Sequence, residues 1–415
     1  MYQPISADLD EQPLTPDTPV QSHTGIALKS LPVHGSIPNS VVPQHLSPAP
    51  RFGILSPYTD PPCGLARYSV GLSGALSAHG ADADVIWAAD GQLSSRSLAV
   101  LEPLNSSVPS GAVCKDLLDQ IDIAVIQHEH GVYADEVVDL VDGLRVPSIV
   151  IVHKIPKRPT SQDRSVFESI VAVADHVVVM SEAARQRLCL DYAVDRRKIT
   201  AIPHGATVPT APRVKRPSRP IILTWGLLHQ GKGIERVIDA MPSLSDVPGR
   251  PRFIVAGPTH PKTLAAEGEA YRDARIEQAR RIGVADSVSF DPRYYDGAML
   301  AALIQQSSVV VLPYDSKEQV TSGVLADAIA NGRPVVATAF PHAVELLDNG
   351  AGIVVDHDDP AALASALRQI LTQPRFAGSM AAEARSRAPE LAWPVVAGAY
   401  LRLAQHVLAG RRATA

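Results

Sequence analysis

Two motifs in this sequence combine bare backbone, hydroxyl groups and one amine where a strand gives way to a helix. The stretch "TWGLLHQGKGIERVIDAM" contains a glycine-rich loop that ends in Lys232 and Gly233. Further on, "TSGVLADAIANG" starts a helix-like run with Thr321, Ser322 and Gly323. The first amides of a helix are unpaired and lie at the positive end of its dipole, so both motifs could hold an anion. Ordinary capping by Ser or Thr and a solvated lysine are the alternative.

Two further loops follow predicted strands, one in each half of the chain. "AFPHAVELLDNGAGIVV" follows a strand of the same predicted sheet, and three loops that converge at one edge suggest a diphosphate site. In the first half, "SPYTDPPCGLARYS" places Gly64 at a strand-to-helix turn, where a small residue lets backbone approach a phosphate or a sugar. Because this turn is not Gly-x-Gly-x-x-Gly, it argues against a dinucleotide-dependent oxidoreductase.

The elements that must position these loops follow from the alternation of short apolar runs with longer amphipathic ones, which is typical of βαβ units. Strands are predicted at "RFGILS", "ADVIWA", "IDIAVIQ", "SIVIVH", "HVVVMS" and "KITAIP", then at "IILTWG", "RFIVAG", "SVSF", "SVVVLPY", "RPVVAT" and "GIVVD". We predict an α/β fold with two Rossmann-like, doubly wound domains that face each other across a cleft. The predicted divisions are a disordered tail at 1–50, domains at 51–207 and 221–388, a Pro-rich hinge linker at 208–220, and a C-terminal helix at 389–415 that packs back across the hinge.

Composition limits the classes of function. The 415 residues, 46% of them hydrophobic, can bury two cores, and a net charge of −5 gives no reason to expect nucleic acid. No apolar run reaches the roughly 18 residues that a membrane span needs, and the N-terminus lacks the features of a signal peptide, so a cytoplasmic protein is predicted. Cys63, Cys114 and Cys189 lie far apart, and neither a disulfide framework nor a metal site is predicted.

The order of these motifs resembles the retaining glycosyltransferases of the GT-B fold, specifically glycosyltransferase family 4. The resemblance rests on the "GKG" loop, on an acidic helix followed by "GRPVVAT", and on the Glu before "GAGIVV". "PHG" after "KITAIP" is similar to the usual hinge motif of that family. It implies that residues 51–207 take the acceptor and residues 221–388 the donor nucleotide, with no cofactor beside the nucleotide-sugar substrate.

The resemblance also implies roles for single residues. It places Lys232 on the donor diphosphate, the amides around Ser322 to Val324 on the phosphate nearest the sugar, and "RYYDG" on the nucleotide base. "QHEHG" would approach the transferred sugar, with His128 the better match and His130 the next, although a loop histidine bonded to backbone is the alternative. The catalytic candidates are His128, Lys232 and Gln319. The donor-binding candidates are Gly64, Gly231, Lys232, Arg293, Tyr294, Thr321, Ser322, Gly323, Val324, Asp327 and Glu345, and the secondary candidates are His130, His153, Glu318 and His342.

Two departures from the pattern of that family matter. The Gly-Arg pair expected before Lys-Gly reads Gly226-Leu227, so one expected cation on the phosphates is missing. The paired glutamates of the family fall on Gln319 and Asp327, with Glu318 one residue out of register. Asp327 keeps an acceptor for ribose hydroxyls, whereas Gln319 cannot act as a nucleophile or a base. A mechanism in which the leaving diphosphate takes the acceptor proton needs neither.

The sequence therefore predicts an enzyme that transfers a hexose from a UDP- or GDP-sugar to a hydroxyl acceptor, such as a glycan, a glycolipid or a small polyol. It is predicted to work with retention of configuration and without a metal. A catalytically altered relative of the same fold, or a sugar-nucleotide sensor that has lost catalysis, is the alternative. The short basic cluster at 196–198 is best explained as an ordinary solvated face, and weak peripheral membrane contact is the alternative. The sequence does not specify the sugar, the acceptor or the oligomeric state.

Overall fold

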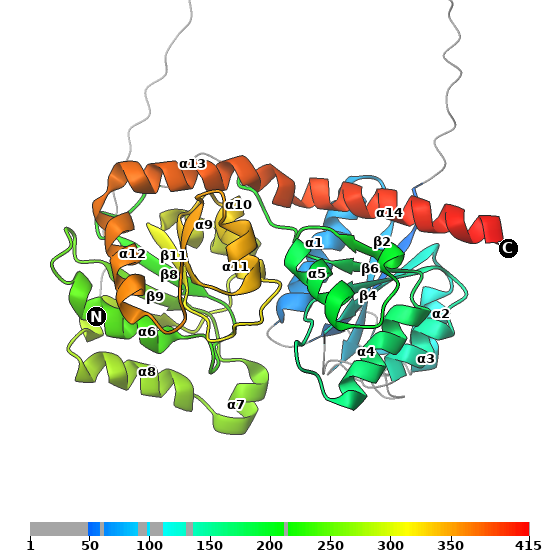
Figure 1. Ribbon diagram of the computed structural model, residues 1–415, viewed down its shortest axis with the longest axis horizontal. Coiled ribbons are helices and arrows are strands. Elements are labelled where there is room, and N and C mark those ends of the chain that lie inside the picture. The colour runs from blue at the N-terminus through cyan, green and yellow to red at the C-terminus, as the bar shows by residue number, and fades with distance from the viewer. Residues whose placement is uncertain are drawn as a thin grey trace, which may run out of the picture. The chain divides into compact units, whose positions relative to one another are not determined.

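A computed structural model describes residues 49–58, 62–89, 98–99, 111–129, 136–210 and 215–414. The predicted tail lies almost wholly outside these residues, as do His130 and part of the predicted hinge. Within them the chain forms two sheets, each flanked by helices (Figure 1). The predicted class, two doubly wound α/β domains, is confirmed.

The first sheet has the strand order β3-β2-β1-β4-β5-β6-β7. Its strands are β1 (Phe52–Tyr58), β2 (Ala83–Ala89), β3 (Leu98–Ala99), β4 (Ile123–His128), β5 (Ser148–Val152), β6 (His176–Val179) and β7 (Ile199–Ala201). All neighbours pair in parallel except β3, a two-residue strand that runs antiparallel to β2 and was not predicted. Its helices are α1 (Gly64–Ala78), α2 (Gly111–Leu118), α3 (Glu136–Asp142), α4 (Ser161–Val173), α5 (Glu182–Asp191) and the 3-10 turn η1 (Arg196–Lys198).

The second sheet is parallel throughout, in the order β10-β9-β8-β11-β12-β13. Its strands are β8 (Ile221–Trp225), β9 (Arg252–Ala256), β10 (Val288–Asp291), β11 (Val309–Leu312), β12 (Val335–Thr338) and β13 (Gly352–Val355). Its helices are α6 (Ile234–Ala240), α7 (Pro261–Glu267), α8 (Ala270–Arg281), α9 (Gly297–Gln306), α10 (Gly323–Ala330), α11 (Pro341–Leu346), α12 (Pro360–Thr372) and α13 (Pro374–Leu391), with 3-10 turns η2 (Met241–Leu244) and η3 (Ala285–Ser287). The last helix of the chain is α14 (Trp393–Thr414).

Helices cover both faces of each sheet, and consecutive strand residues point to opposite faces, so both sets of side chains are buried. In β1, Leu55 joins a core with α2 to α5, whereas its neighbour Ile54 joins a core with α1 and α14. In the second sheet, Ile222 and Leu223 of β8 divide in the same way between two cores. This burial explains why the strands read as continuous apolar runs in the sequence. Among the described helices, none combines the length and the apolar character that a membrane crossing requires.

Helix α14 belongs to the first sheet although it follows the second in the chain. Tyr400 is fully buried, and its hydroxyl lies 2.9 Å from that of Tyr68 on α1. At the start of α14, the Trp393 indole lies between two glycines. A β-carbon on Gly71 would lie 2.3 Å from the ring, and one on Gly205 would lie 2.2 Å from it. The absence of a side chain at Gly71 and Gly205 therefore makes room for the indole.

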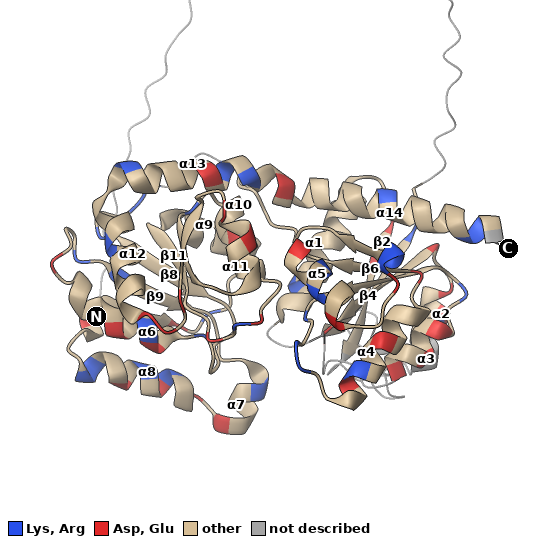
Figure 2. Cartoon of the chain, viewed as in Figure 1, with Lys and Arg blue, Asp and Glu red and all other residues tan. Residues whose placement is uncertain are grey.

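Charged side chains of both signs are interspersed along helices such as α4 and α8 (Figure 2). The basic cluster of η1 is committed to local contacts. Arg197 pairs with Asp195 at 2.9 Å, Lys198 donates to the carbonyl of Ala172 at 2.8 Å, and Arg196 donates to the carbonyl of Cys189 at 3.1 Å. These contacts favour a solvated surface turn, and membrane contact stays a prediction.

Candidate functional site

The loop between β8 and α6 adopts backbone conformations that favour glycine. Gly226, Gly231 and Gly233 have φ angles of 119°, 86° and 65°, a region that residues with a β-carbon rarely adopt. A β-carbon on Gly233 would lie 1.7 Å from the carbonyl oxygen of Pro313, which follows β11. The start of α6 is therefore pressed directly against the neighbouring strand, and this contact fixes the position of Lys232.

Lys232 is the predicted phosphate ligand, and its ammonium lies at the carboxyl edge of the sheet. Its Nζ lies 4.7 Å from the centre of the Tyr314 ring and would lie 3.9 Å from a β-carbon on Gly226. Burial lowers the pKa of Lys232 to about 8. No carboxylate in the described part of the chain comes within ion-pair distance of it. A partly desolvated cation without an anion is a suitable partner for a bound phosphate.

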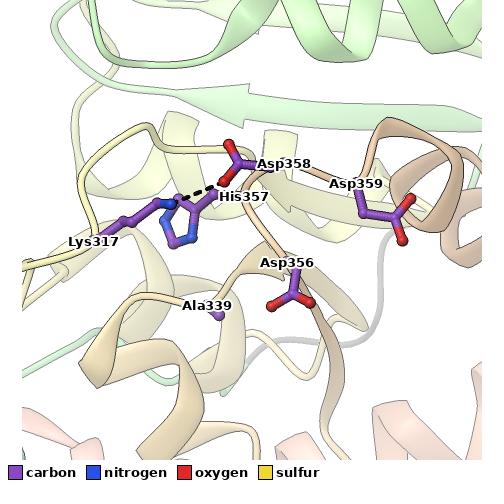
Figure 3. Close-up of a pocket in the computed structure, with 6 residues that line it drawn as sticks. All are labelled: Lys317, Ala339, Asp356, His357, Asp358 and Asp359. Atoms are coloured by element: carbon purple, nitrogen blue, oxygen red, sulfur yellow. Dashed lines mark hydrogen bonds and ion pairs between the residues drawn. The ribbon is translucent and has the colours of Figure 1, made fainter.

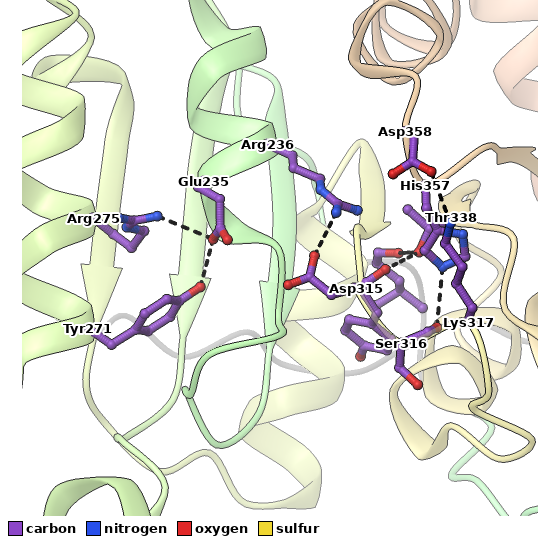
Figure 4. Close-up of polar contacts among 12 residues, drawn as sticks. Glu235, Arg236, Tyr271, Arg275, Asp315, Ser316, Lys317, Thr338, His357 and Asp358 are labelled. Carbon is purple, nitrogen blue, oxygen red and sulfur yellow. Dashed lines mark hydrogen bonds and ion pairs between the residues drawn. The ribbon is translucent and has the colours of Figure 1, made fainter. Parts of the chain in front are cut away.

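The loop that follows β11 is tied to the Lys232 loop. The amide of Asp315 donates to the carbonyl of Gly231 at 3.0 Å, and the Asp315 carboxylate pairs with Arg236 of α6 at 2.8 Å (Figure 4). On the far side of α6, Glu235 accepts from the hydroxyl of Tyr271 at 2.8 Å and pairs with Arg275 at 3.4 Å. The bond of the Asp315 amide and the Asp315–Arg236 ion pair thus connect the loop of Lys232 to the loop that leads into α10.

The start of α10 matches its prediction in part. Ser322 caps the helix, since its hydroxyl accepts from the amide of Leu325 at 3.2 Å. Its own amide donates to Nδ1 of His342 at 2.9 Å and is therefore used within the protein. The amides of Gly323 and Val324 are in the first turn, where a helix supplies no acceptor for them. These two amides, rather than that of Ser322, are available to an anion.

Thr321 and Gln319 lie just before this helix. The Thr321 hydroxyl oxygen is buried and has no hydrogen-bond partner among the described residues, which is costly unless a ligand or water supplies one. The Gln319 side chain donates its amide to the carbonyl of Thr321 at 2.9 Å. Gln319 therefore braces the loop, a contact that the sequence did not indicate.

Several candidates lie where the two halves of the chain touch. Both carboxylate oxygens of Glu345 accept amides at the start of α5, from Glu182 at 2.9 Å and from Ala183 at 2.8 Å. Glu345 thus caps a helix of the first half, and its donor contact stays a prediction. Glu318 is exposed, and its carboxylate accepts from the amide of Lys157 at 3.2 Å. Asp327 lies 3.5 Å from Arg67 of α1.

Histidines gather at the carboxyl ends of the first sheet. His128 is buried at the end of β4, with its ring 5.8 Å from that of Phe167. His153, after β5, bonds through Nε2 to the Gln127 side-chain oxygen at 2.6 Å. Burial holds the pKa of His153 well below its usual range, so this histidine is neutral at pH 7. The predicted His128 and the secondary candidate His153 thus lie at neighbouring strand ends.

His204 is a site residue that the residue-by-residue comparison missed. It belongs to "PHG" after β7, and its Nε2 would lie 2.8 Å from a β-carbon on Gly323. Its ring packs edge-on against Tyr68, with the ring centres 5.0 Å apart. Burial lowers its pKa to about 4 and that of His342 to about 3. The "PHG" motif was the signal in the sequence that could have identified His204, since it precedes the predicted hinge.

The remaining candidates are more open. Arg293 pairs with Asp291 at 2.6 Å and donates to the Tyr295 hydroxyl at 2.9 Å, so its guanidinium is engaged. Tyr294 keeps 37% of its surface exposed and could stack on a ring. At the start of α1, nothing lies within 4 Å of where a Gly64 β-carbon would be, which leaves backbone accessible there.

Two shallow pockets lie near these loops. One, of about 400 Å³, is lined by Lys317, Ala339, Asp356, His357, Asp358 and Asp359, and Lys317 pairs with Asp358 across it at 2.9 Å (Figure 3). The other, of about 450 Å³, is lined by Gln230, Gly231, Glu235, Glu267, Ala270, Tyr271, Ala274, Arg275 and Asp315. Of the predicted site residues, Gly231 alone lines either of these two pockets. Neither pocket therefore marks the predicted site.

Comparisons with known proteins agree with this arrangement. Residues 219–373 match the family model described as Glycosyl transferases group 1, and residues 62–208 match the one described as Glycosyltransferase Family 4. The chain is 30% identical over 259 residues to a glycogen synthase of Mycobacterium tuberculosis (strain ATCC 25618 / H37Rv), covering 60% of this chain and 58% of that protein. It is 25% identical over 316 residues to a D-inositol 3-phosphate glycosyltransferase of Segniliparus rotundus, covering 72% of this chain and 65% of that protein. The match thus spans less than two thirds of these relatives.

Solved structures share the fold. Sucrose-phosphate synthase from Thermosynechococcus elongatus superposes with a TM-score of 0.69 at 20% identity, over 87% of this chain and 100% of that one. Alr3699/HepE of Anabaena, solved in complex with UDP and glucose, gives a TM-score of 0.67 at 15% identity, over 86% of this chain and 100% of that one. From the two matched segments and this shared architecture, we conclude that the chain belongs to the glycosyltransferases of the GT-B fold, of the family 4 type.

Proposed function

We propose that the chain transfers a hexose from a UDP- or GDP-sugar to a hydroxyl acceptor with retention of configuration. The observation that carries this proposal is Lys232, a partly desolvated cation without an anion among the described residues. Its Nζ and the Val324 side chain at the start of α10 would each lie 3.9 Å from a β-carbon on Gly226. Such a group favours the diphosphate of a leaving nucleotide, whose negative charge grows as the sugar departs. The Anabaena protein of similar fold was solved with UDP, which supports a nucleotide donor here.

The proposed mechanism assigns the chemistry to charge stabilisation. Lys232 and the start of α10 would offset the charge of the departing diphosphate, and a metal ion is not needed for that task. His128, buried at the end of β4, would lie against the transferred sugar from the first half. Because Gln319 is bonded to its own loop, the departing phosphate itself would take the acceptor proton on the same face of the sugar. This order of events gives retention without a protein nucleophile.

The direct test is to incubate the purified protein with UDP- and GDP-hexoses and follow release of UDP or GDP, together with thermal shift for each donor. Turnover supports the transferase. Stabilisation without turnover, even with a panel of polyol and glycan acceptors, supports the sensor instead. A ligand at 100 times its dissociation constant raises stability by about 2.7 kcal/mol, which such a measurement resolves readily.

The affinity for UDP or GDP is expected to fall as the pH rises through about 8, the pKa of Lys232 in the free protein. The protonated ammonium binds phosphate, and the terminal phosphate of the nucleotide is already ionised because its second pKa is about 6. Between pH 7 and pH 9 the loss should approach about tenfold, since roughly nine in ten lysines would then be neutral. Calorimetric titration at both pH values measures it. Lys232→Arg stays charged and should flatten the profile, whereas a flat wild-type profile would remove Lys232 from the phosphate site.

Variants of the loop before α10 test the role of Gln319. Gln319→Ala removes one hydrogen bond to the carbonyl of Thr321 and should lower transfer less than tenfold, because such a bond contributes about 0.5–1.5 kcal/mol. Gln319→Glu should cost more than alanine, since a carboxylate would face that carbonyl oxygen. Glu318→Gln should do little, because Glu318 is exposed. Steady-state rates with one donor decide the matter. Loss of turnover in Glu318→Gln with a silent Gln319→Ala would make Glu318 the first carboxylate of the family.

A further inference from the structure

Arg67 is a cation of the first half that reaches the second. It lies on α1, and its Nη2 is 3.5 Å from the Asp327 carboxylate on α10, the outer limit of a hydrogen bond. About a third of the Arg67 side chain, 35%, is exposed. By contrast, Arg293 pairs with Asp291 at 2.6 Å, and Arg236 pairs with Asp315 at 2.8 Å. Of these three arginines near the site, Arg67 is the one held by a single long contact.

The guanidinium of Arg67 lies close to the start of α10. Asp327 comes four residues after Gly323, so the two share one face of the helix and are separated by about 6 Å along its axis. An independent observation places Arg67 beside the first turn. Tyr68, the residue after Arg67, packs against the ring of His204 with the ring centres 5.0 Å apart, and Nε2 of that ring would lie 2.8 Å from a β-carbon on Gly323. The guanidinium at Asp327 therefore lies about one helical turn from the amides of Gly323 and Val324.

The charge of the proposed ligand requires such a group. A bound diphosphate carries at least two negative charges, whereas Lys232 supplies one positive charge and a helix start about half of one. Position 227, where a second cation was expected, is Leu227. Arg293 and Arg236 are held by their own carboxylates. While no ligand is present, the half-buried Asp327 carboxylate holds the Arg67 guanidinium.

We propose that Arg67 is a second cation on the diphosphate of the donor, held by Asp327 in the free protein and transferred to the phosphate oxygens when a nucleoside diphosphate binds. This proposal rests on the proposed function, since it names a further ligand of the same donor. The transfer also releases the Asp327 carboxylate, which can then accept hydrogen bonds from the ribose hydroxyls. The two halves of the chain thereby contribute one cation each to the same phosphates.

The test compares Kd values for UDP, GDP and inorganic diphosphate, measured by calorimetry. Arg67→Ala should weaken UDP or GDP by roughly tenfold, the loss of a charge-assisted hydrogen bond. Asp327→Asn should have the opposite effect on the affinity for inorganic diphosphate, which has no ribose. It should tighten the binding of inorganic diphosphate about threefold or more, because the carboxylate no longer holds Arg67. In Arg67→Ala/Asp327→Asn that gain should disappear. The double variant leaves no buried, unpaired carboxylate, so the comparison with Asp327→Asn holds even if Arg67→Ala folds poorly.

Arg164→Ala is the matched control, because Arg164 is a half-exposed arginine of the first half that pairs with Glu168 on α4. It removes the same charge away from the site and should leave all three Kd values unchanged. Equal affinities of wild type and Arg67→Ala, or equal affinities of Asp327→Asn and the double variant, would overturn the assignment while the donor site stands. A wild-type protein that binds neither UDP nor GDP would overturn the proposed function, and this assignment with it.

Discussion

Replacement of Lys232 by alanine is expected to lower glycosyl transfer by on the order of a hundredfold, the usual loss when one preorganised charge stabiliser is removed. The ammonium has no carboxylate partner among the described residues, so the substitution leaves no unpaired anion behind. The variant should therefore be as stable as wild type, or slightly more stable, because a partly desolvated charge has been removed. Steady-state kinetics with the accepted UDP- or GDP-sugar, together with a thermal melt, measure both effects.

Lys317→Ala is the control for this experiment. Lys317 lies in the loop after β11, the strand that pairs with β8; it is exposed and pairs with Asp358 at 2.9 Å, so its loss should change transfer little. A Lys232→Ala variant that keeps near wild-type activity would show that the "GKG" loop does not bind the diphosphate. Equal losses in both variants would instead indicate a general effect of positive charge on donor binding.

Trp393→Ala is expected to lower the free energy of unfolding by roughly 3 kcal/mol, the lower end of the range for a buried tryptophan because this side chain is partly exposed. The indole fills the space left by Gly71 of α1 and Gly205 of the "PHG" motif, and its ring centre lies 5.2 Å from that of Tyr68. Its loss opens a cavity where α14 joins the first sheet. Urea denaturation followed by circular dichroism measures the change.

Two glycines of one helix provide the matched pair for this prediction. Gly71→Ala places a methyl group 2.3 Å from the indole and should destabilise the protein, whereas nothing lies within 4 Å of a β-carbon on Gly74. Gly74→Ala should therefore stabilise the protein by up to about 1 kcal/mol through helix propensity. If Gly71→Ala and Gly74→Ala changed the free energy of unfolding equally, that result would contradict the described packing of Trp393 on α1. Combining Gly71→Ala with Trp393→Ala should cost less than the sum of the two.

The fold could be predicted because its strands are buried on both faces and so appear as apolar runs. Even the returning helix was indicated by an apolar, helical stretch after the last strand. The exception was β3, where Leu98 and Ala99 form a strand too short to show a period. Such an edge strand depends on its neighbour β2 rather than on its own sequence.

The candidate site could be predicted where it depends on local sequence and could not where it depends on contacts between distant segments. The glycine-rich loop positions Lys232 through its own backbone angles. The partners of Glu345, Ser322 and Asp327 lie 163, 20 and 260 residues away along the chain. A motif comparison assigns a side chain to a ligand without knowing that another segment already binds it. The contacts that Glu345 and the amide of Ser322 make with other segments are of this kind.

The packing of α14 on the first sheet also has a consequence for protein synthesis. Tyr68 and Tyr400 are 332 residues apart, and the apolar face of β1 and α1 is covered in part by α14. At about 5–20 residues per second, a ribosome needs roughly 17–66 seconds to make the intervening chain. The strands of the first sheet are complete at β7, so for part of that time the apolar area that α14 later covers stays exposed, and there a nascent chain would engage a chaperone that recognises apolar surface.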